Sequence, residues 1–422
     1  MSWRLCILNK RRVVITGGGV CSSLGDNWEE ILKTLKGFEN CVVRMDDWDR
    51  FGAGMNTRLA APYTKELRKY DRKKVRSMGR VSRLALQATD DALRMAGFID
   101  ENGNVAEELH NGRCGIAYGS CMGSMDANME FCAMLESNDC TRMNATTYVR
   151  AMPQTAASNL SVYFQIRGRI ITTNTACTSG SQSIGYSYEQ IAYGFQDIMI
   201  AGGAEELSPA DSDIFDTLYA ASTKNDTPKK SPSPFSVERD GLVIGEGGAT
   251  LILEEYEHAK ARGANIIAEI IGFGTNQDGN HITTPQQETM AKALELAIED
   301  AGISPDEIGY VNAHGTSTPH GDVAESRATE SVFKRAVPVS STKSYTGHTL
   351  GCCGTLEAWV TINMMKDGWF HPTLNLTKEN LDPECGKLDY IMDQGREIKT
   401  DIVMSNNFAF GGVNTSLIFK RV

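Results

Sequence analysis

The hydrophobic and polar positions of the chain fall into two alternating patterns. Short runs of apolar and β-branched residues are typical of strands, and the longer stretches between them place apolar residues three or four positions apart, as in helices. A regular alternation of strands and helices predicts an α/β protein. Strands are expected at residues 13–16, 115–118, 197–201, 249–254, 268–271, 309–312, 337–341, 401–404 and 415–419.

Two of the predicted helices are amphipathic and resemble each other. One begins at Val81 and the other at Thr289, and each ends in Ala-Gly, at Gly97 and Gly302. A glycine directly after the last periodic residue is a common helix terminator. Each helix is followed by a strand, then by a polar turn that opens another helix, and finally by two glycines and a strand.

The repeated order of these segments indicates an internal duplication. We expect a leader at residues 1–11, a first half at 12–260 and a second half at 261–422, with the join near residues 256–267. Matching turns of a duplicated α/β unit lie at the same ends of neighbouring sheets, so a site can form between the halves.

Composition and charge narrow the class of protein. The chain is 41% hydrophobic and 23% charged, which is typical of a globular protein. No apolar run approaches the roughly 20 residues of a membrane span, and the N-terminus lacks the pattern of a secretory signal. The net charge of −11 argues against nucleic acid as a partner. Eleven cysteines without a C-x-x-C pair indicate reduced thiols and a cytoplasmic location.

One segment departs from this acidity. Between Lys65 and Arg83 there are nine basic residues and two acidic ones. The segment is either the solvated face of a charged helix start or a docking surface for an acidic partner. In the second case opposite charge would speed the encounter.

Cys177 is the first candidate for chemistry. It follows a β-branched run and opens a predicted helix whose apolar face carries Ile184, Tyr188 and Ile191. The free N–H groups and partial positive charge of a helix N-terminus favour a thiolate and can bind a developing oxyanion. Because free cysteines are more often small core residues, the local pattern leaves both interpretations open.

Two histidines favour the catalytic interpretation. His314 and His348 are among only seven histidines, and each lies just beyond a predicted strand. Loops at strand ends are where α/β proteins place their sites. A single histidine in such a loop is usually structural, but two of them at strand ends equivalent to that of Cys177 are hard to attribute to chance. Lys343 and Glu357, on either side of His348, are candidates for a buried ion pair.

Two competing motifs are weaker. "VVITGGGVCSSLG" begins like a dinucleotide-binding turn, but the position of its third glycine is Ser22. His314, His320 and Asp322 are poorly spaced for zinc and lack a further ligand, so we expect no metal.

Four separated motifs resemble those of one enzyme family. "TACTSG" at Cys177, "AHGTST" at His314, "TKSYTGH" ending at His348 and "NNFAFGGVN" at Phe410 follow the order and spacing of the β-ketoacyl-[acyl carrier protein] synthases of types I and II. The resemblance runs from about residue 12 to the end. It implies the thiolase-like fold, in which duplicated βαβαβαββ halves form a five-layered α-β-α-β-α sandwich, normally as a dimer.

The resemblance also implies a reaction and its residues. Cys177 is similar to the nucleophile, His314 and His348 to the catalytic histidines, and Lys343 with Glu357 to the pair that supports them. The implied reaction is the decarboxylative Claisen condensation of malonyl-carrier with an acyl group held on Cys177, which lengthens a fatty acyl chain by two carbons. No cofactor is expected on the enzyme, because phosphopantetheine of the acyl carrier protein carries both substrates.

Further positions match binding motifs of the family. Phe410 resembles its gating phenylalanine, whose backbone N–H joins that of Cys177 in an oxyanion hole. Thr316 and Thr318 resemble the threonines that bind the phosphopantetheine arm. The basic segment resembles the docking stretch for the acidic carrier protein, with three residues most implicated, namely Arg72, Lys73 and Arg76.

The chain departs from the family pattern in the gate and the acyl pocket. Ala409 replaces a gate glycine, Met122 occupies the position that tunes acyl-pocket depth, and cysteines stand at 352 and 353 in place of alanines. Residues 278–284 resemble a second mobile loop, with Asp278 as its hinge. These departures keep a second function open, that of the elongating ketosynthase of a type II polyketide or aryl-polyene pathway. In that case the protein would form a heterodimer with a chain-length factor rather than a homodimer. The two-histidine pattern disfavours a thiolase, and the presence of Cys177 disfavours a non-catalytic partner subunit.

Overall fold

The computed structural model of the chain describes residues 10–141 and 143–422, so most of the expected leader, residues 1–9, lies outside the described residues. An eleven-stranded mixed sheet runs through the molecule and divides into two halves. The first half has the strand order β5 (Ile170–Thr172), β4 (Cys114–Gly119), β6 (Ile198–Glu205), β8 (Gly247–Glu255) and β1 (Val13–Ser22). The second half has the order β9 (Ala268–Gln277), β16 (Val413–Lys420), β15 (Ile402–Phe408), β10 (Tyr310–Asn312), β11 (Pro338–Ser340) and β13 (Asp389–Tyr390).

The two halves share one pairing pattern. In the first half β4 is parallel to β5 and β6, and β8 is antiparallel to β6 and β1. In the second half β10 is parallel to β11 and β15, and β16 is antiparallel to β15 and β9. The halves meet where β1 pairs with β9 over three residues, Val13 to Ile15. The duplication expected from the sequence is therefore confirmed, and the expected boundary at residue 260 falls within α8 (Tyr256–Ala261).

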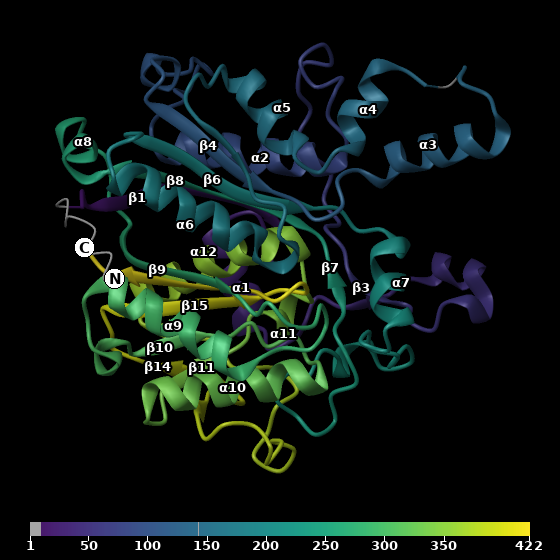
Figure 1. The fold of residues 1–422 in the computed structure, drawn as a ribbon, viewed down its shortest axis with the longest axis vertical. Coiled ribbons are helices and arrows are strands. Elements are labelled where there is room, and N and C mark those ends of the chain that lie inside the picture. Colours follow the sequence, from purple (N-terminus) through teal and green to yellow (C-terminus); the bar gives the residue numbers. More distant parts are fainter. Residues whose placement is uncertain (1–9, 142) are drawn as a thin grey trace.

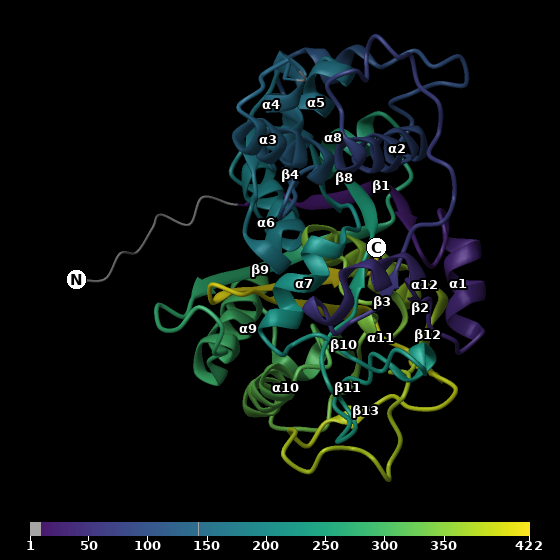
Figure 2. The same ribbon diagram turned by 90° about the vertical axis from the view of Figure 1, so that its right-hand side faces the viewer.

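Helices separate and cover the two halves of the sheet in five layers (Figure 1). The outer layer on the first half holds α2 (Arg80–Met95) and α5 (Thr155–Phe164), and that on the second half holds α9 (Gln287–Ala301) and α10 (Pro319–Phe333). The central layer holds α6 (Ser179–Ala192) and α12 (Cys353–Asp367), which pack on each other. Figure 2 shows the same order of layers from the side. Every residue of α12 from Cys353 to Met365 is buried, as a helix between two sheets requires.

Smaller elements surround this core. The remaining helices are α1 (Trp28–Lys36), α3 (Met125–Ser137), α4 (Ala145–Ala151), α7 (Pro209–Thr217) and α11 (Lys343–Thr346). The remaining strands are β2 (Val43–Arg44), β3 (Leu59–Ala61), β7 (Ile244–Gly245), β12 (Trp369–Phe370) and β14 (Arg396–Glu397). In the described part of the chain, no helix combines the length and the apolar character needed to cross a membrane.

All nine strands expected from the sequence are present, several of them longer than expected. β1 continues to Ser22 because it pairs with β8 along nearly its whole length. The glycines that resembled a nucleotide-binding turn lie inside this strand. A Cβ atom on Gly18 would stand 2.3 Å from the ring of Trp359 in α12, and one on Gly19 would stand 2.1 Å from the carbonyl oxygen of Ala88 in α2. The glycines thus allow helices to pack closely on both faces of β1.

Candidate active site

Cys177 lies in a tight turn that leads into the central layer. After β5 the chain makes a 3₁₀ turn at Ala176–Thr178 and enters α6 at Ser179, so the α-helix begins two residues later than expected. The Thr175 N–H donates to Ser179 Oγ at 3.0 Å, and that hydroxyl donates to the carbonyl of Ala176 at 2.7 Å. Ala176 has a φ of 49°, a left-handed conformation that non-glycine residues rarely adopt.

The environment of Cys177 opposes ionisation more than it favours it. Burial raises the pKa of the thiol to about 11, while the charge of Lys343 and the backbone N–H groups of Phe410 and of Cys177 itself act to lower it. The sequence predicted a lowered pKa and a favoured thiolate, and this prediction is wrong. The pKa is raised instead, because desolvation outweighs the effect of the N–H groups at the turn. The same two N–H groups nevertheless converge on the reactive sulfur.

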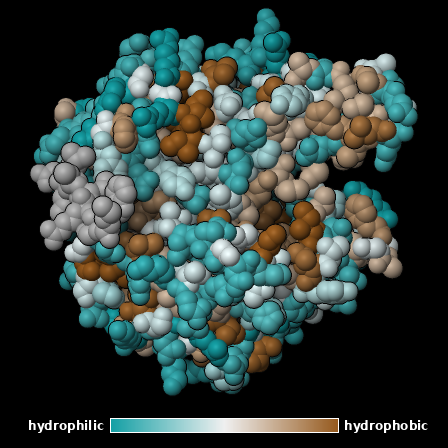
Figure 3. All heavy atoms as spheres, viewed as in Figure 1, coloured by the Kyte–Doolittle hydropathy of each residue, from teal (hydrophilic) through white to brown (hydrophobic). Residues whose placement is uncertain are grey.

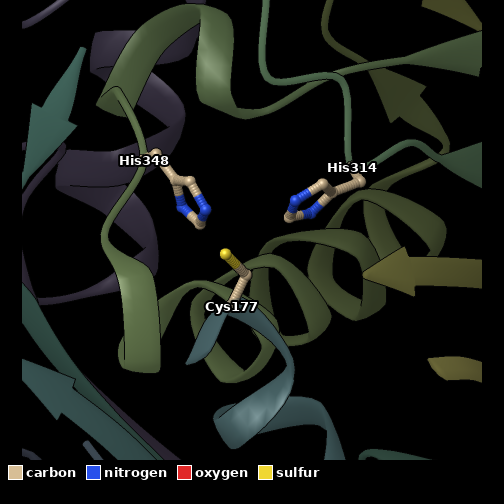
Figure 4. Close-up of side chains that lie close together, drawn as sticks. All are labelled: Cys177, His314 and His348. Carbon is tan, nitrogen blue, oxygen red and sulfur yellow. The ribbon is translucent and has the colours of Figure 1, made fainter. Parts of the chain in front are cut away.

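His314 and His348 face this sulfur from the second half of the fold. His314 follows β10, and His348 lies between α11 and α12. Their ring centroids are 5.2 Å apart with nearly perpendicular planes. Figure 4 shows both imidazoles and the Cys177 thiol pointing into one space. The sequence prediction that these three residues meet between the halves is therefore matched by the geometry.

Hydrogen bonds fix the tautomer of each histidine. His348 Nδ1 accepts the Leu350 N–H at 3.2 Å, and His314 Nδ1 accepts from Lys343 Nζ at 3.0 Å and from Asn407 Nδ2 at 3.3 Å. A ring nitrogen that accepts carries no proton, so each neutral ring is protonated on Nε2. His348 Nε2 is buried and has no hydrogen-bond partner among the described residues.

Both histidines are held neutral. Burial, followed by the nearby charge of Lys343, lowers the pKa of each imidazole well below its usual value. At neutral pH the site therefore presents two N–H donors next to the thiol, without a net charge on either ring. Such a pair is suited to an oxyanion or an enolate oxygen.

Lys343 and Glu357 form a buried ion pair behind His314. Both side chains are 1% exposed, and Lys343 Nζ donates to Glu357 Oε1. Asn407 Nδ2 donates to Glu357 Oε2 at 2.7 Å and also reaches His314. Despite burial, the Coulombic attraction of Glu357 raises the pKa of Lys343, which keeps the ammonium charged. That charge adds to burial in disfavouring a protonated His314.

The thiol and the imidazoles are also close enough for a metal ion. One ligand atom from each of Cys177, His314 and His348 lies within 4.8 Å of the others, and His314, Cys353 and Glu357 form a second such group. Metal ligation by Nε2 would require the proton to move to Nδ1, where each histidine already accepts a hydrogen bond. The hydrogen bonds thus favour proton donors over metal ligands.

Asp322 and His320, the other two residues considered for a zinc site, belong to neither of these groups of possible ligands. Asp322 is buried and accepts the backbone N–H groups of Phe235 and Ser317 at 2.8 and 3.1 Å, which fixes the loop after β10. His320 is exposed at the start of α10.

A cavity of about 450 Å³ opens from the three catalytic candidates to the surface. Thr316 and Thr318 line it, with their hydroxyl oxygens 3.0 Å apart. α7 forms part of its wall, and Figure 3 shows hydrophobic residues gathered on the surface over this helix, where Ile214 and Leu218 are 41% and 47% exposed. The cavity therefore combines an apolar mouth with hydroxyl groups along its length, as a binding channel for a slender thioester arm would.

Two loops meet at the mouth of the cavity. The Gly411 N–H donates to the carbonyl of Ile282 at 2.7 Å, and the Asp278 N–H donates to the carbonyl of Gly412 at 2.8 Å. The loop 278–284 and the loop that carries Phe410 are thus joined by backbone hydrogen bonds. Ala409 does not have a positive φ, so the alanine is tolerated in place of the family's glycine without backbone strain.

One predicted site residue, Met122, and one of the two cysteines that replace alanines, Cys353, lie away from this cavity. Met122 does not line it, and its N–H donates to Glu205 at 3.2 Å. Cys353 packs beneath the site, where its thiol donates to the carbonyl of Cys177 at 3.2 Å.

The basic segment divides into two groups. Lys65, Arg68 and Arg80 form ion pairs with acidic residues of the first half. Arg72, Lys73 and Arg76 are exposed and form no ion pair with any described residue. We call these three residues the basic patch.

Sequence reasoning missed three residues of the site. Asn407 connects His314 to Glu357, and Glu325 accepts the N–H groups of His314 and Gly315 at 2.6 and 2.7 Å. Phe215 packs on Phe410 with ring centroids 5.3 Å apart. Only Asn407 lay within a recognised motif, and only its place in the fold shows what it contacts.

Comparisons with known proteins agree with this geometry. Residues 10–259 match the N-terminal domain of β-ketoacyl synthases, and residues 267–377 match their C-terminal domain. The 3-oxoacyl-[acyl-carrier-protein] synthase 2 of Vibrio cholerae is 38% identical over 98% of this chain and 100% of its own length. A crystal structure of a β-ketoacyl synthase from Burkholderia phymatum is 56% identical and superposes with a TM-score of 0.94, covering 98% of this chain and 100% of the other.

A more distant likeness is to the ishigamide ketosynthase/chain length factor, at 29% identity and a TM-score of 0.86, over 98% of this chain and 100% of that one. The matched domains, the relatives of equal length and the Cys-His-His geometry agree, and the chain belongs to the β-ketoacyl synthase family.

Proposed function

We propose that this protein is a β-ketoacyl-[acyl carrier protein] synthase that lengthens fatty acyl chains by two carbons. The observation that carries the proposal is the meeting of one thiol with two neutral Nε2–H donors in a buried cavity. Curated relatives over the full chain are 3-oxoacyl-[acyl-carrier-protein] synthases, which supports the same reaction. The enzyme itself holds no cofactor in this proposal, because phosphopantetheine carries both substrates.

In the first half-reaction, Cys177 takes the acyl group from its carrier. The sulfur attacks the thioester carbonyl, and the thiol proton leaves with the departing pantetheine thiol. The N–H groups of Phe410 and Cys177 bind the tetrahedral oxyanion, a contribution worth about 3 kcal/mol for each such donor. Thr316 and Thr318 bind the pantetheine arm as it passes along the cavity.

In the second half-reaction, malonyl-carrier loses CO₂ and the resulting enolate attacks the acyl-cysteine. His314 and His348 donate their Nε2–H groups to the enolate oxygen, and Lys343 with Glu357 holds His314 neutral and oriented. The new carbon–carbon bond releases the Cys177 thiolate, which regains a proton. The products are CO₂ and a 3-oxoacyl group on the carrier, longer by two carbons.

A second candidate is the elongating ketosynthase of a polyketide or aryl-polyene pathway. The likeness to a ketosynthase/chain length factor pair favours it, at 29% identity, but less strongly than the closer fatty-acid relatives. In both functions Phe410 acts as a gate that opens when substrate arrives. Met122, which does not line the cavity while this gate is closed, sets the depth of the acyl pocket that the opening exposes.

We propose that two copies form the working enzyme in the cytoplasm. β5 is the outer strand of the first half, Ile170 in it is 47% exposed, and Val162 of α5 is 78% exposed. An apolar edge strand is a natural surface for pairing with a second copy. The described cysteines are all free, in keeping with a reducing compartment.

The direct test supplies acyl-carriers of different lengths and malonyl-carrier to the purified protein. We expect a stable acyl adduct on the protein and a 3-oxoacyl product longer by two carbons, both followed by mass spectrometry. The acyl group that reacts fastest separates fatty acyl elongation from aryl-polyene priming, and light scattering of the same sample distinguishes dimer from monomer. Failure of every carrier to form an adduct would contradict the proposed mechanism.

The basic patch makes a prediction about the carrier. Changing Arg72, Lys73 and Arg76 to glutamate is expected to raise the apparent KM for acyl-carrier on the order of tenfold, because the acidic carrier loses its attraction. A small acyl-pantetheine substrate should react as before. The matched control reverses three exposed lysines of the second half, Lys378, Lys399 and Lys420, with the same change in net charge. Equal loss with both substrates would count against docking at the patch.

A further inference from the structure

A group of buried acidic side chains lies outside the mechanism described above. Glu206, Asp211 and Ser212, which we call the acid cluster, are 7%, 1% and 1% exposed. One carboxylate oxygen of Glu206 accepts the Met125 N–H at 2.7 Å, and the backbone N–H of Ser208 lies near the carboxylate of Asp211. The other oxygens, Glu206 Oε2 and Asp211 Oδ1, and the Ser212 hydroxyl are buried without a hydrogen-bond partner among the described residues.

Buried polar groups of this kind normally have partners. An unpartnered buried acceptor or donor carries a desolvation cost of roughly 1–3 kcal/mol, so several in one place mark a position where a polar group of a ligand, or a water molecule, would be bound favourably. Burial raises the pKa of Glu206 to about 7 and that of Asp211 to about 8, and neighbouring carboxylates, including Glu205, act in the same direction. Near neutral pH Asp211 is therefore mostly protonated and Glu206 about half protonated, so the acid cluster offers both O–H donors and oxygen acceptors.

The acid cluster lies behind the wall of the active-site cavity. Phe215, one helical turn after Asp211 in α7, lines the cavity and packs on Phe410. The thiol of Cys121 lies near both Cys177 and Glu205 and belongs to the same apolar group as Phe215 and Phe410. Moving away from the Cys177 sulfur, the apolar wall therefore comes first, and the acid cluster lies behind it.

We propose that the acid cluster recognises a hydroxyl group at the far end of the acyl chain carried on Cys177. This inference rests on the proposed function and names its substrate class. The chain passes between Phe215 and Phe410, its apolar part contacts the wall, and its terminal hydroxyl donates to one free oxygen of the cluster and accepts from a protonated carboxyl. A terminal methyl group would leave the cluster unpartnered, and a terminal carboxylate would be buried as a charge beside the ionised fraction of Glu206.

The test compares matched acyl-pantetheine thioesters of increasing length that end in methyl, hydroxyl, amino or carboxylate groups. The measurement is the rate at which Cys177 becomes acylated, followed by intact mass. At the best length, wild-type protein is expected to prefer hydroxyl over methyl about tenfold or more. Asp211→Leu is expected to abolish or reverse this preference, while Asp211→Asn, which keeps a hydrogen-bonding side chain of the same shape, retains most of it.

Thr217→Val is the matched control, because Thr217 is exposed on the same helix and outside the acid cluster. It should leave both rates unchanged. Equal acylation by methyl and hydroxyl substrates in wild type, or preference for the amino or carboxylate end, would overturn the inference while leaving the proposed function intact. Absence of acylation by any thioester would instead contradict the proposed function, and the inference would fall with it.

Discussion

Replacement of Cys177 by alanine is expected to remove the acyl adduct and to reduce condensation on the order of 10⁴-fold or more. The alanine has no atom that can hold the acyl group as a thioester, so the reaction loses its covalent intermediate. The two N–H groups at the turn and the two histidines remain in place, but they have no acyl-enzyme to act on. Intact mass after incubation with acyl-carrier, together with the yield of 3-oxoacyl product, measures both effects.

The control for this variant is Cys353→Ala. Cys353 is also a buried thiol, and it donates to the carbonyl of Cys177 rather than facing the cavity. We expect this variant to keep the acyl adduct. An adduct of full occupancy on Cys177→Ala protein would show that a different residue carries the acyl group, and the assignment of the nucleophile would then be wrong.

Removal of either histidine is expected to separate the two half-reactions. His348→Ala should acylate Cys177 at nearly the wild-type rate, because the oxyanion donors of that step are backbone N–H groups. Loss of malonyl-carrier decarboxylation and condensation on the order of 10²- to 10³-fold is expected, since one of two donors to the enolate is gone. Adduct formation by mass and CO₂ release from malonyl-carrier measure the two steps independently.

His314→Ala should lose more than His348→Ala, because it also removes one buried acceptor of both Lys343 and Asn407, which keep their hydrogen bonds to Glu357. The double variant is expected to lose less than the product of the single effects, since the two donors act as a unit. His371→Gln, which alters a buried histidine outside the cavity, controls for the loss of a buried imidazole and should retain condensation. Unchanged decarboxylation in His348→Ala would remove this residue from the mechanism.

The pattern of the chain was a reliable guide to regular elements. Strands such as β6 and β16 each contain a short apolar run, IMIA and LIF, and helices such as α2 and α9 carry their apolar residues at helical spacing, so local sequence indicates both. The two-residue strands β7 and β13 were not predicted, because they exist only through pairing with distant partners. The glycines of β1 were open to misreading for the same reason, since their purpose is the approach of Trp359 and α2.

The site shows the same division between local pattern and distant contacts. Motifs indicated Cys177, His314, His348 and Lys343, and the family resemblance added Glu357. The structure brings all five together. The sign of the Cys177 pKa shift, the tautomers of both histidines and the role of Asn407 could not be read from the motifs. Each depends on burial and on hydrogen bonds between segments far apart in the chain.

By itself, then, the sequence determined the α/β class, the duplication and the residues that can react, because periodicity and residue chemistry are local properties. Only the tertiary structure decided which groups are neutral, which protons point into the cavity, and that one oxygen each of Glu206 and Asp211 is buried without a partner among the described residues. Desolvation and hydrogen bonding depend on everything that surrounds a side chain, and those surroundings exist only after the two halves have packed together.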